Sequence, residues 1–294
     1  MKYFRIFILF LLFIEGGGGI LSAGPPLRIE HLPQTIQQGD VCLIKASGPA
    51  SLKSIYGEFR KERLPMAVQG PHGTYVGLLG MDMNIEPARY KLTVMATDEN
   101  RGIHKSILTL KVEKTDFRTQ TLSLPPHMVD LDAQTMERVE KEEKRLKVLF
   151  SGYRKEKLWK GPFARPVPGE LSTKFGLRRI INGQPKSPHT GVDLRAEEGT
   201  PVLASNDGIV VLVDQLFFPG KSVILDHGWG TYSMYFHLSE ILVRKGDRIS
   251  KENVLGRVGS TGRSKGPHLH WGVRMNGARV DPVALLRLGE GLRE

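Results

Sequence analysis

The sequence PHLHWGV at residues 267–273 places His268 and His270 two positions apart. Successive side chains of an extended strand point to opposite faces, so these two imidazoles share one face. The sequence HTGVD at residues 189–193 places His189 and Asp193 four positions apart. That spacing also returns to one face, in a strand or over a helical turn. The two stretches therefore predict two pairs of polar side chains, each pair on one face.

Brought together, the pairs offer three imidazoles and one carboxylate. Neutral imidazole and carboxylate are good zinc ligands, and a catalytic zinc site uses three protein ligands and leaves one position for water. The last 106 residues hold five of the nine histidines, namely His189, His227, His237, His268 and His270. Chemistry alone does not decide which of them bind. The cluster predicts a metal-dependent hydrolase.

The bulk composition is that of an ordinary globular protein. The chain has 294 residues, of which 40% are hydrophobic and 25% charged, and this length predicts two domains. The net charge of +11 favours anionic partners such as cell-wall polymer, acidic lipid or nucleic acid. The sequence contains no nucleic-acid motif and no basic stripe interleaved with aromatic residues, so we expect no nucleic-acid partner.

Residues 1–23 predict an export signal. Lys2 and Arg5 precede an apolar run over residues 6–14, and small residues end at Ala23. Nine apolar residues are too few to span a bilayer. The cleavage site is imperfect because Leu21 lies three positions before a cut after Ala23, which leaves membrane attachment through an uncleaved segment as an alternative. The protein is expected in the periplasm or outside the cell.

The sequence predicts a mostly β protein. Three parts follow the expected export signal. Alternating apolar residues and recurrent glycine turns predict an immunoglobulin-like β-sandwich over residues 27–115. Residues 116–160 form a charged linker that is helical over 130–150, where mixed charges recur at spacings of three and four. Residues 161–288 form a compact, mostly antiparallel β domain.

Two local signals accompany these domains. Cys42, the one cysteine, lies in the apolar run Val41–Ile44, and we expect it to be a buried strand residue without a disulfide. Asn276-Gly277 between two short apolar stretches is a strong hairpin signal.

Several blocks in the C-terminal half occur together in a recognisable order. They are HTGVD at 189–193, GTPV at 199–202, Asp207-Gly208, Asp226-His227-Gly228, YFHL at 235–238 and GSTGRSKGPHLHWGV at 259–273. In these blocks the chain resembles the lysostaphin-type zinc metallopeptidases, the LytM-like cell-wall endopeptidases. The resemblance covers roughly residues 161–288.

The resemblance implies one Zn²⁺ per chain, held by His189, Asp193 and His270. It makes His237 and His268 the two catalytic histidines, without deciding which is the general base. It also implies peptidoglycan as the substrate, cleaved at stem or cross-bridge peptide bonds. The alternative is a catalytically silent regulator that activates a separate cell-wall amidase, against which the complete set of ligands argues.

Other residues of these blocks have less certain roles in the sequence. His227 is expected to stabilise a turn, since it is not a ligand in the family pattern. If its segment is a regular strand, Tyr235 shares a face with His237, and either lines the cleft or packs there. Arg263 and Lys265 lie in a turn-rich loop where they could meet an acidic substrate. A cleft blocked by the N-terminal domain is a further hypothesis, under which truncation to about residue 161 would raise activity.

Overall fold

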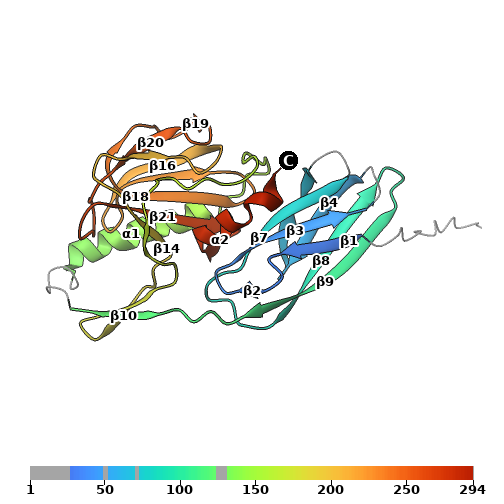
Figure 1. Ribbon diagram of the computed structural model, residues 1–294, viewed down its shortest axis with the longest axis horizontal. Coiled ribbons are helices and arrows are strands. Elements are labelled where there is room, and N and C mark those ends of the chain that lie inside the picture. Colours follow the sequence, from blue (N-terminus) through green and yellow to red (C-terminus); the bar gives the residue numbers. More distant parts are fainter. Residues whose placement is uncertain (1–26, 49–51, 70–72, 124–130, 294) are drawn as a thin grey trace, which may run out of the picture.

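A computed structural model describes residues 27–48, 52–69, 73–123 and 131–293. Two β-rich bodies lie side by side and a long connector joins them (Figure 1), so the predicted mostly β fold class is confirmed. Within the described residues, no helix is both long and apolar enough to cross a membrane. The expected export signal at residues 1–23 lies outside them.

The N-terminal body is a sandwich of two sheets. One sheet has the order β1-β3-β7-β6 and the other β2-β9-β8-β4-β5. All pairings are antiparallel except β2 with β9, which is parallel. Its strands are β1 (Arg28–Leu32), β2 (Ile36–Gln37), β3 (Val41–Ser47), β4 (Leu52–Phe59), β5 (Glu62–Pro65), β6 (Ala67–Gln69), β7 (Thr74–Gly80), β8 (Arg89–Asp98) and β9 (Ile103–Glu113).

Strand β3 is buried on both faces, which explains its uninterrupted apolar run. Cys42 and Ile44 belong to the core between the two sheets of the sandwich. Val41 and Leu43 belong instead to a core that continues into the C-terminal body. Strands covered on both sides lose the alternation of a half-buried strand. The prediction of a buried strand residue for Cys42 is confirmed, because its relative exposure is 0%.

The C-terminal body is built on one large sheet of order β11-β14-β21-β18-β17-β16-β19, with β15, β20 and β22 attached beside it. The expected hairpin at Asn276-Gly277 joins β21 to β22. The strands are β11 (Leu171–Thr173), β14 (Gly191–Arg195), β15 (Pro201–Leu203), β16 (Gly208–Leu216), β17 (Gly220–Asp226), β18 (Thr231–Ile241), β19 (Arg248–Ile249), β20 (Val254–Val258), β21 (His268–Met275) and β22 (Ala278–Val280). A short helix α2 (Pro282–Arg287) and a 3₁₀ turn η2 (Gly289–Leu292) follow.

The connector adds its own strand to the C-terminal body. Strand β10 (Thr119–Leu122) runs parallel to β12 (Arg178–Ile181), which forms a hairpin with β13 (Gln184–Lys186). This parallel pair joins segments about 60 residues apart, and the sequence analysis did not predict it. Figure 1 shows the connector leaving the lower end of the sandwich and running below the C-terminal body to reach this small sheet.

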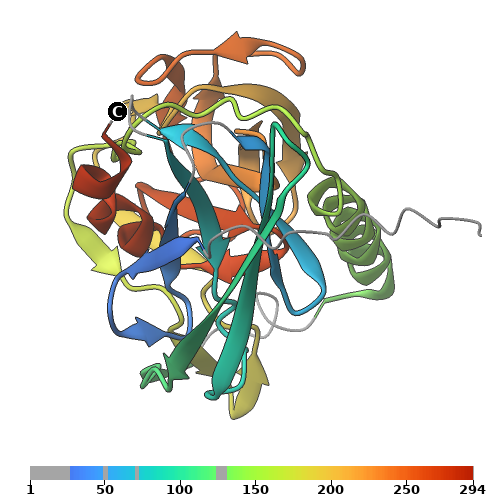
Figure 2. The same cartoon turned by 90° about the vertical axis from the view of Figure 1, so that its right-hand side faces the viewer.

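The connector continues as helix α1 (Ala133–Phe150), which packs on one face of the C-terminal sheet, over β16, β17 and β18. Arg145 pairs with Asp214, and Glu142 accepts a hydrogen bond from the backbone N–H of Phe217. Leu146, Leu149 and Phe150 pack on a small apolar cluster beneath the helix. Viewed from the side of the sandwich, α1 lies at the flank of the C-terminal body (Figure 2). The helix is therefore held against this face of the sheet by both polar and apolar contacts.

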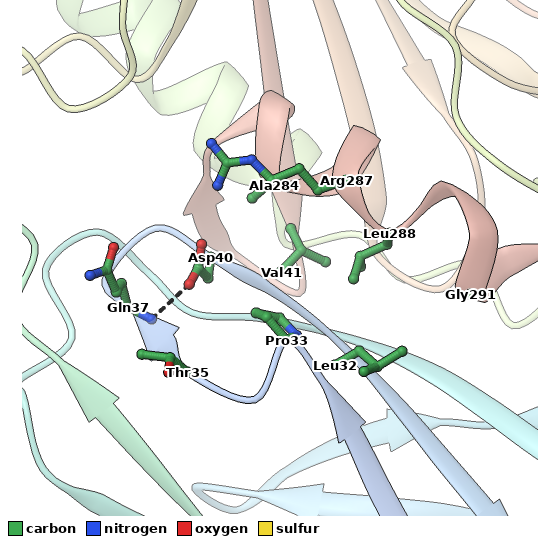
Figure 3. Close-up of a pocket in the computed structure, with 10 residues that line it drawn as sticks. All are labelled: Leu32, Pro33, Thr35, Gln37, Asp40, Val41, Ala284, Arg287, Leu288 and Gly291. Atoms are coloured by element: carbon green, nitrogen blue, oxygen red, sulfur yellow. Dashed lines mark hydrogen bonds between the residues drawn. The ribbon is translucent and has the colours of Figure 1, made fainter.

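Polar contacts fix the two bodies at their junction. The Arg279 guanidinium donates to both carboxylate oxygens of Asp82, at 2.8 and 3.1 Å. The backbone N–H of Asp281 donates to the carbonyl of Gly39 at 2.7 Å. Beside these contacts lies a cavity of about 520 Å³, lined by the β1–β3 turns and by the α2–η2 segment (Figure 3).

Candidate metal centre

The pairing of β14 with β21 places Asp193 directly opposite His270. His189 lies two residues before β14, and its backbone is held by two hydrogen bonds to the 176–177 loop. Gly191 lies between them, where a Cβ would come within 2.7 Å of His270 Nε2. Only glycine lets the two strands approach this closely, so the HTGVD spacing serves the contact between ligand strands.

Three metal-binding atoms converge on one point. His189 Nε2, Asp193 Oδ1 and His270 Nδ1 lie 2.9 Å from one another in each of the three pairings. Ligand atoms at ~2.0–2.1 Å from a tetrahedral zinc would lie about 3.3 Å apart, so a small outward movement accommodates the ion. His189 and Asp193 are buried, while His270 reaches solvent with 12% of its side chain. This donor set fits zinc.

The protonation of the proposed ligand side chains depends on their hydrogen-bond partners and on burial. The Lys174 carbonyl accepts a hydrogen bond from His189 Nδ1 at 3.0 Å, which leaves the Nε2 lone pair pointing into the cluster. Burial alone would raise the pKa of Asp193, but the His189 and His270 rings hold that pKa well below its usual range. Burial lowers the pKa of His270. The cluster therefore presents an ionised carboxylate at neutral pH, and burial favours the neutral form of His270.

Two further imidazoles flank the cluster, and both are anchored in the same way. His237 Nδ1 donates to the Thr261 carbonyl, and His268 Nδ1 donates to the Gly266 carbonyl, each at 2.8 Å. Their ring centroids lie 4.8 Å apart, and His268 Nε2 lies 3.8 Å from Asp193 Oδ1. Burial, with a smaller effect from His270, lowers the pKa of His237 to about 4. Both rings thus offer an unprotonated Nε2 beside the cluster when neutral.

His237 reaches the site because its strand is irregular. Its φ of 62° lies in the left-handed region, and the pairing of β18 shifts register beside it. Alternation therefore fails here, and Tyr235 does not line the site. The Tyr235 hydroxyl accepts a hydrogen bond from the backbone N–H of Ser205 and lies 2.9 Å from Ser233 Oγ, so this side chain packs in the core. Of the two alternatives left open by the sequence, packing is the one observed.

His227 is a buried structural residue. Its Nδ1 lies 2.7 Å from the Asp207 carbonyl and its Nε2 lies 2.7 Å from Ser233 Oγ, so the ring links three strand ends. Burial lowers its pKa to about 4. The side chain takes no part in the metal cluster, and its hydrogen bonds agree with the expected role in a turn.

The N-terminal region supports the ligand His189 through Phe175. The ring of Phe175 lies against Gly39 of the sandwich, where a Cβ would come within 2.7 Å of it. Phe117 of the connector also packs on the Phe175 ring, with ring centroids 6.2 Å apart. The neighbouring residue of Phe175 is Lys174, whose carbonyl orients His189. These contacts connect the sandwich and the connector to the site, and the blocked cleft stays a hypothesis.

Comparison with known proteins agrees with the geometry. Residues 187–282 match Peptidase family M23. This stretch is an M23 domain. Within it lie all five residues predicted for the site, and the resemblance to LytM-like peptidases is confirmed.

Individual relatives give the same family. The peptidoglycan DD-endopeptidase ShyA of Vibrio cholerae is 38% identical over 114 residues, which cover 38% of this chain and 26% of ShyA. The DD-carboxypeptidase/endopeptidase Mpg of Neisseria meningitidis is 43% identical over 115 residues, covering 39% of this chain and 26% of Mpg. These matches therefore span about a quarter of each relative's length.

One solved structure matches more than the M23 domain. A crystal structure assigned to peptidase M23 of Pseudomonas aeruginosa superposes with a TM-score of 0.64 at 28% identity. The match covers 85% of this chain and 94% of that chain, so the N-terminal sandwich is included in the shared fold.

One residue at the M23 site was not found by sequence reasoning. Arg179, on β12, brings its Nη2 within 3.9 Å of Asp193 Oδ2. Its neighbours in the sequence form no motif that points to the site. The pairing of β12 with β10 and β13, together with the backbone hydrogen bonds between the 176–177 loop and His189, places it there.

The first prediction concerns the pH dependence of folding. The folded-state pKa of His227, about 4, lies below the unfolded value of about 6.5. The unfolded chain therefore binds more protons between these values, and stability is lost as pH falls through that window. We expect wild type to lose up to about 3 kcal/mol more than His227→Gln between pH 7 and pH 4, measured by urea unfolding in the presence of a chelator. His31→Gln, which removes an N-terminal histidine, serves as the control. Parallel profiles for wild type and His227→Gln would contradict this account.

The second prediction concerns the support of His189. Phe117→Ala removes the ring that covers Phe175, and we expect zinc affinity to fall about tenfold, as for other outer-shell changes. The matched control is Tyr90→Ala, a half-buried aromatic residue that packs on Phe59 in the sandwich. It should cost stability without changing zinc affinity, measured by competition with a chromogenic chelator. Equal zinc affinities of wild type, Phe117→Ala and Tyr90→Ala would show that Phe117 does not support His189.

Proposed function

We propose that this chain is a zinc-dependent peptidoglycan endopeptidase that hydrolyses stem or cross-bridge peptide bonds of the bacterial cell wall. The observation that carries the proposal is the convergence of His189, Asp193 and His270 at 2.9 Å beside two imidazoles that are not part of the cluster. The cluster alone would suit a structural ion. The two flanking imidazoles supply groups that a hydrolase needs and a structural site does not.

His189, Asp193 and His270 are the proposed ligands of one zinc ion. Zinc held there would supply Lewis acidity, which polarises a scissile carbonyl and acidifies water. The Lys174 carbonyl fixes the tautomer of His189, and the strand register fixes Asp193 against His270. These partners hold the donor atoms in place before the ion arrives.

His237 and His268 are the proposed catalytic residues. Each Nδ1 donates to a backbone carbonyl, so each ring is fixed with Nε2 as its one proton acceptor. Such an Nε2 can take a proton from an attacking water near neutral pH. The protonated ring then becomes the donor that the leaving amine needs. The other ring can hydrogen-bond the developing oxyanion when it is protonated, because its Nε2 then carries a proton.

Peptidoglycan is supported by the relatives and by charge. ShyA and Mpg are named for peptidoglycan and DD-peptide cleavage, respectively. The net charge of +11 suits an anionic polymer. The N-terminal sequence supports a location in the periplasm or outside the cell, where this polymer lies.

The third prediction separates the ligands from the catalytic residues. His189→Ala, Asp193→Ala or His270→Ala should abolish both zinc binding and hydrolysis. His237→Ala and His268→Ala should keep one zinc per chain and lose about 10²–10⁴-fold in rate, which is the usual contribution of a positioned acid or base. Zinc is measured by elemental analysis, and hydrolysis by mass spectrometry of muropeptides from purified sacculi.

The controls of this experiment define its outcome. A chelator should stop wild-type hydrolysis and added zinc should restore it. His227→Gln, outside the cluster, should keep the zinc. Hydrolysis by a verified zinc-free ligand variant would refute the proposal. Zinc binding without any hydrolysis by wild type would favour the silent regulator of a separate amidase.

A further inference from the structure

Two arginines flank the proposed reaction centre, and among the described residues the long contact of Arg179 with Asp193 is the one ion pair that they make. Arg179 lies on β12, and its Nη2 is 3.9 Å from Asp193 Oδ2, beyond hydrogen-bond distance. Its Nε is buried and has no hydrogen-bond partner among the described residues. An unpartnered buried donor is costly, and in native proteins it calls for a missing partner.

The second arginine belongs to the loop that carries the anchors of His268. Arg263 lies between Thr261, which accepts from His237, and Ser264, which contacts His268 Nδ1. Its guanidinium stacks 3.9 Å above the ring of Phe218, which fixes its plane. No carboxylate of the described residues lies within ion-pair distance of it.

The two guanidinium groups are close enough to affect each other. Burial, and then the charge of Arg179, lowers the pKa of Arg263. Two like charges held in proximity repel, and Asp193 offsets them only through the long contact of its Oδ2 with Arg179 at 3.9 Å. A planar guanidinium matches a carboxylate in a bidentate geometry, so an anion with two oxygens would satisfy both groups.

We propose that Arg179 and Arg263 form a subsite for a free carboxylate on the substrate residue that supplies the scissile nitrogen. The inference rests on the proposed peptidase function. In a peptide, the carboxyl carbon of that residue lies ~3–4 Å from the scissile carbonyl carbon, so its carboxylate falls beside the metal ligands. Arg179 is in contact range of one of those ligands, and Arg263 neighbours the anchors of both catalytic histidines.

This subsite selects among peptide bonds by chemistry. A carboxylate on the carbon attached to the scissile nitrogen is free in a C-terminal residue. It is also free in a diamino dicarboxylic acid whose second amine forms a cross-link. A glycine bridge or any interior bond of an α-linked chain carries an amide there and lacks the charge. The structure therefore points to bonds whose nitrogen-side residue keeps a free carboxylate, and away from glycine bridges and interior α-linked bonds.

The connector holds one half of the subsite in place. The backbone N–H of Arg178 donates to the Arg118 carbonyl at 2.9 Å, where β10 and β12 pair. Since side chains alternate along a strand, Arg178 and Arg179 point to opposite faces of β12. The pairing thus directs Arg179 toward Asp193.

The test measures kcat/KM of full-length, zinc-loaded wild type and arginine variants on two substrates. Two synthetic peptides differ only at the residue that supplies the scissile nitrogen, which carries either a carboxylate or a carboxamide. Wild type should cleave the carboxylate peptide with a kcat/KM about tenfold higher or more, the range of a charge-assisted hydrogen bond. In Arg179→Ala and Arg263→Ala this ratio should fall toward one, while zinc content stays at the wild-type level.

Two control variants make the result specific. Arg179→Lys keeps the charge and loses the bidentate geometry, so its ratio should lie between those of wild type and Arg179→Ala. Arg28→Ala removes the same charge from a side chain that is 80% exposed in the sandwich, and should keep the wild-type ratio.

Three outcomes overturn the inference. The first is an equal kcat/KM for the two peptides in wild type, which leaves the peptidase function intact. The second is a fall in the kcat/KM of Arg179→Ala that is the same for both peptides and is accompanied by a loss of bound zinc. Arg179 would then act only by holding Asp193 in place. The third is cleavage of neither peptide nor of muropeptides, which removes the proposed function itself and this inference with it.

Discussion

The site depends on one cross-strand pair, Asp193 opposite His270. Directly opposed residues of an antiparallel ladder have Cβ atoms about 4.5–5.5 Å apart, so their side chains can meet a common ion. A slip of one residue between β14 and β21 would turn every side chain of one strand to the other face. The buried residues Val192, Leu194 and Trp271 oppose that slip, since each would leave the core. The hydrophobic pattern that folds the sheet thus also aligns the metal-binding groups.

The N-terminal sandwich packs on the C-terminal body and contributes contacts that extend to the site. Its sheet β1-β3-β7-β6 is covered on both faces, by the other sheet of the sandwich and by the C-terminal body. Asp82 and Arg279 add a bidentate ion pair at the junction. Through Phe175 and the connector, the same contacts extend to the carbonyl that orients His189. The arrangement couples the position of the sandwich to the geometry of the site.

Local sequence patterns predicted what depends on local periodicity. The spacing of His268 and His270, together with the HTGVD block, correctly identified side chains that meet in space, because β21 is a regular strand. The same reasoning left the role of Tyr235 open. A residue with positive φ and a shift in register reverse the alternation at His237, and neither is visible in the residue types.

Long-range pairing was beyond the reach of sequence reasoning. The parallel contact of β10 with β12 joins the connector to the peptidase body, and no periodic signal marks either strand. Arg179 reaches the centre through the folded positions of β12 and of the 176–177 loop, so it could not be identified from the sequence. Arg263 was noted as a residue that could meet an acidic substrate, and its position beside the anchors of His237 and His268 gives that expectation a structural basis.

The most direct measurement is the metal coordination of the purified full-length protein. Zinc K-edge X-ray absorption, with anomalous diffraction from crystals to locate the ion, reports both identity and ligands. The account predicts one zinc per chain with two imidazole nitrogens and one carboxylate oxygen at ~2.0–2.2 Å, from His189, His270 and Asp193. An ion bound elsewhere, or zinc-replete protein in which these three side chains lie apart with no ion between them, would contradict it.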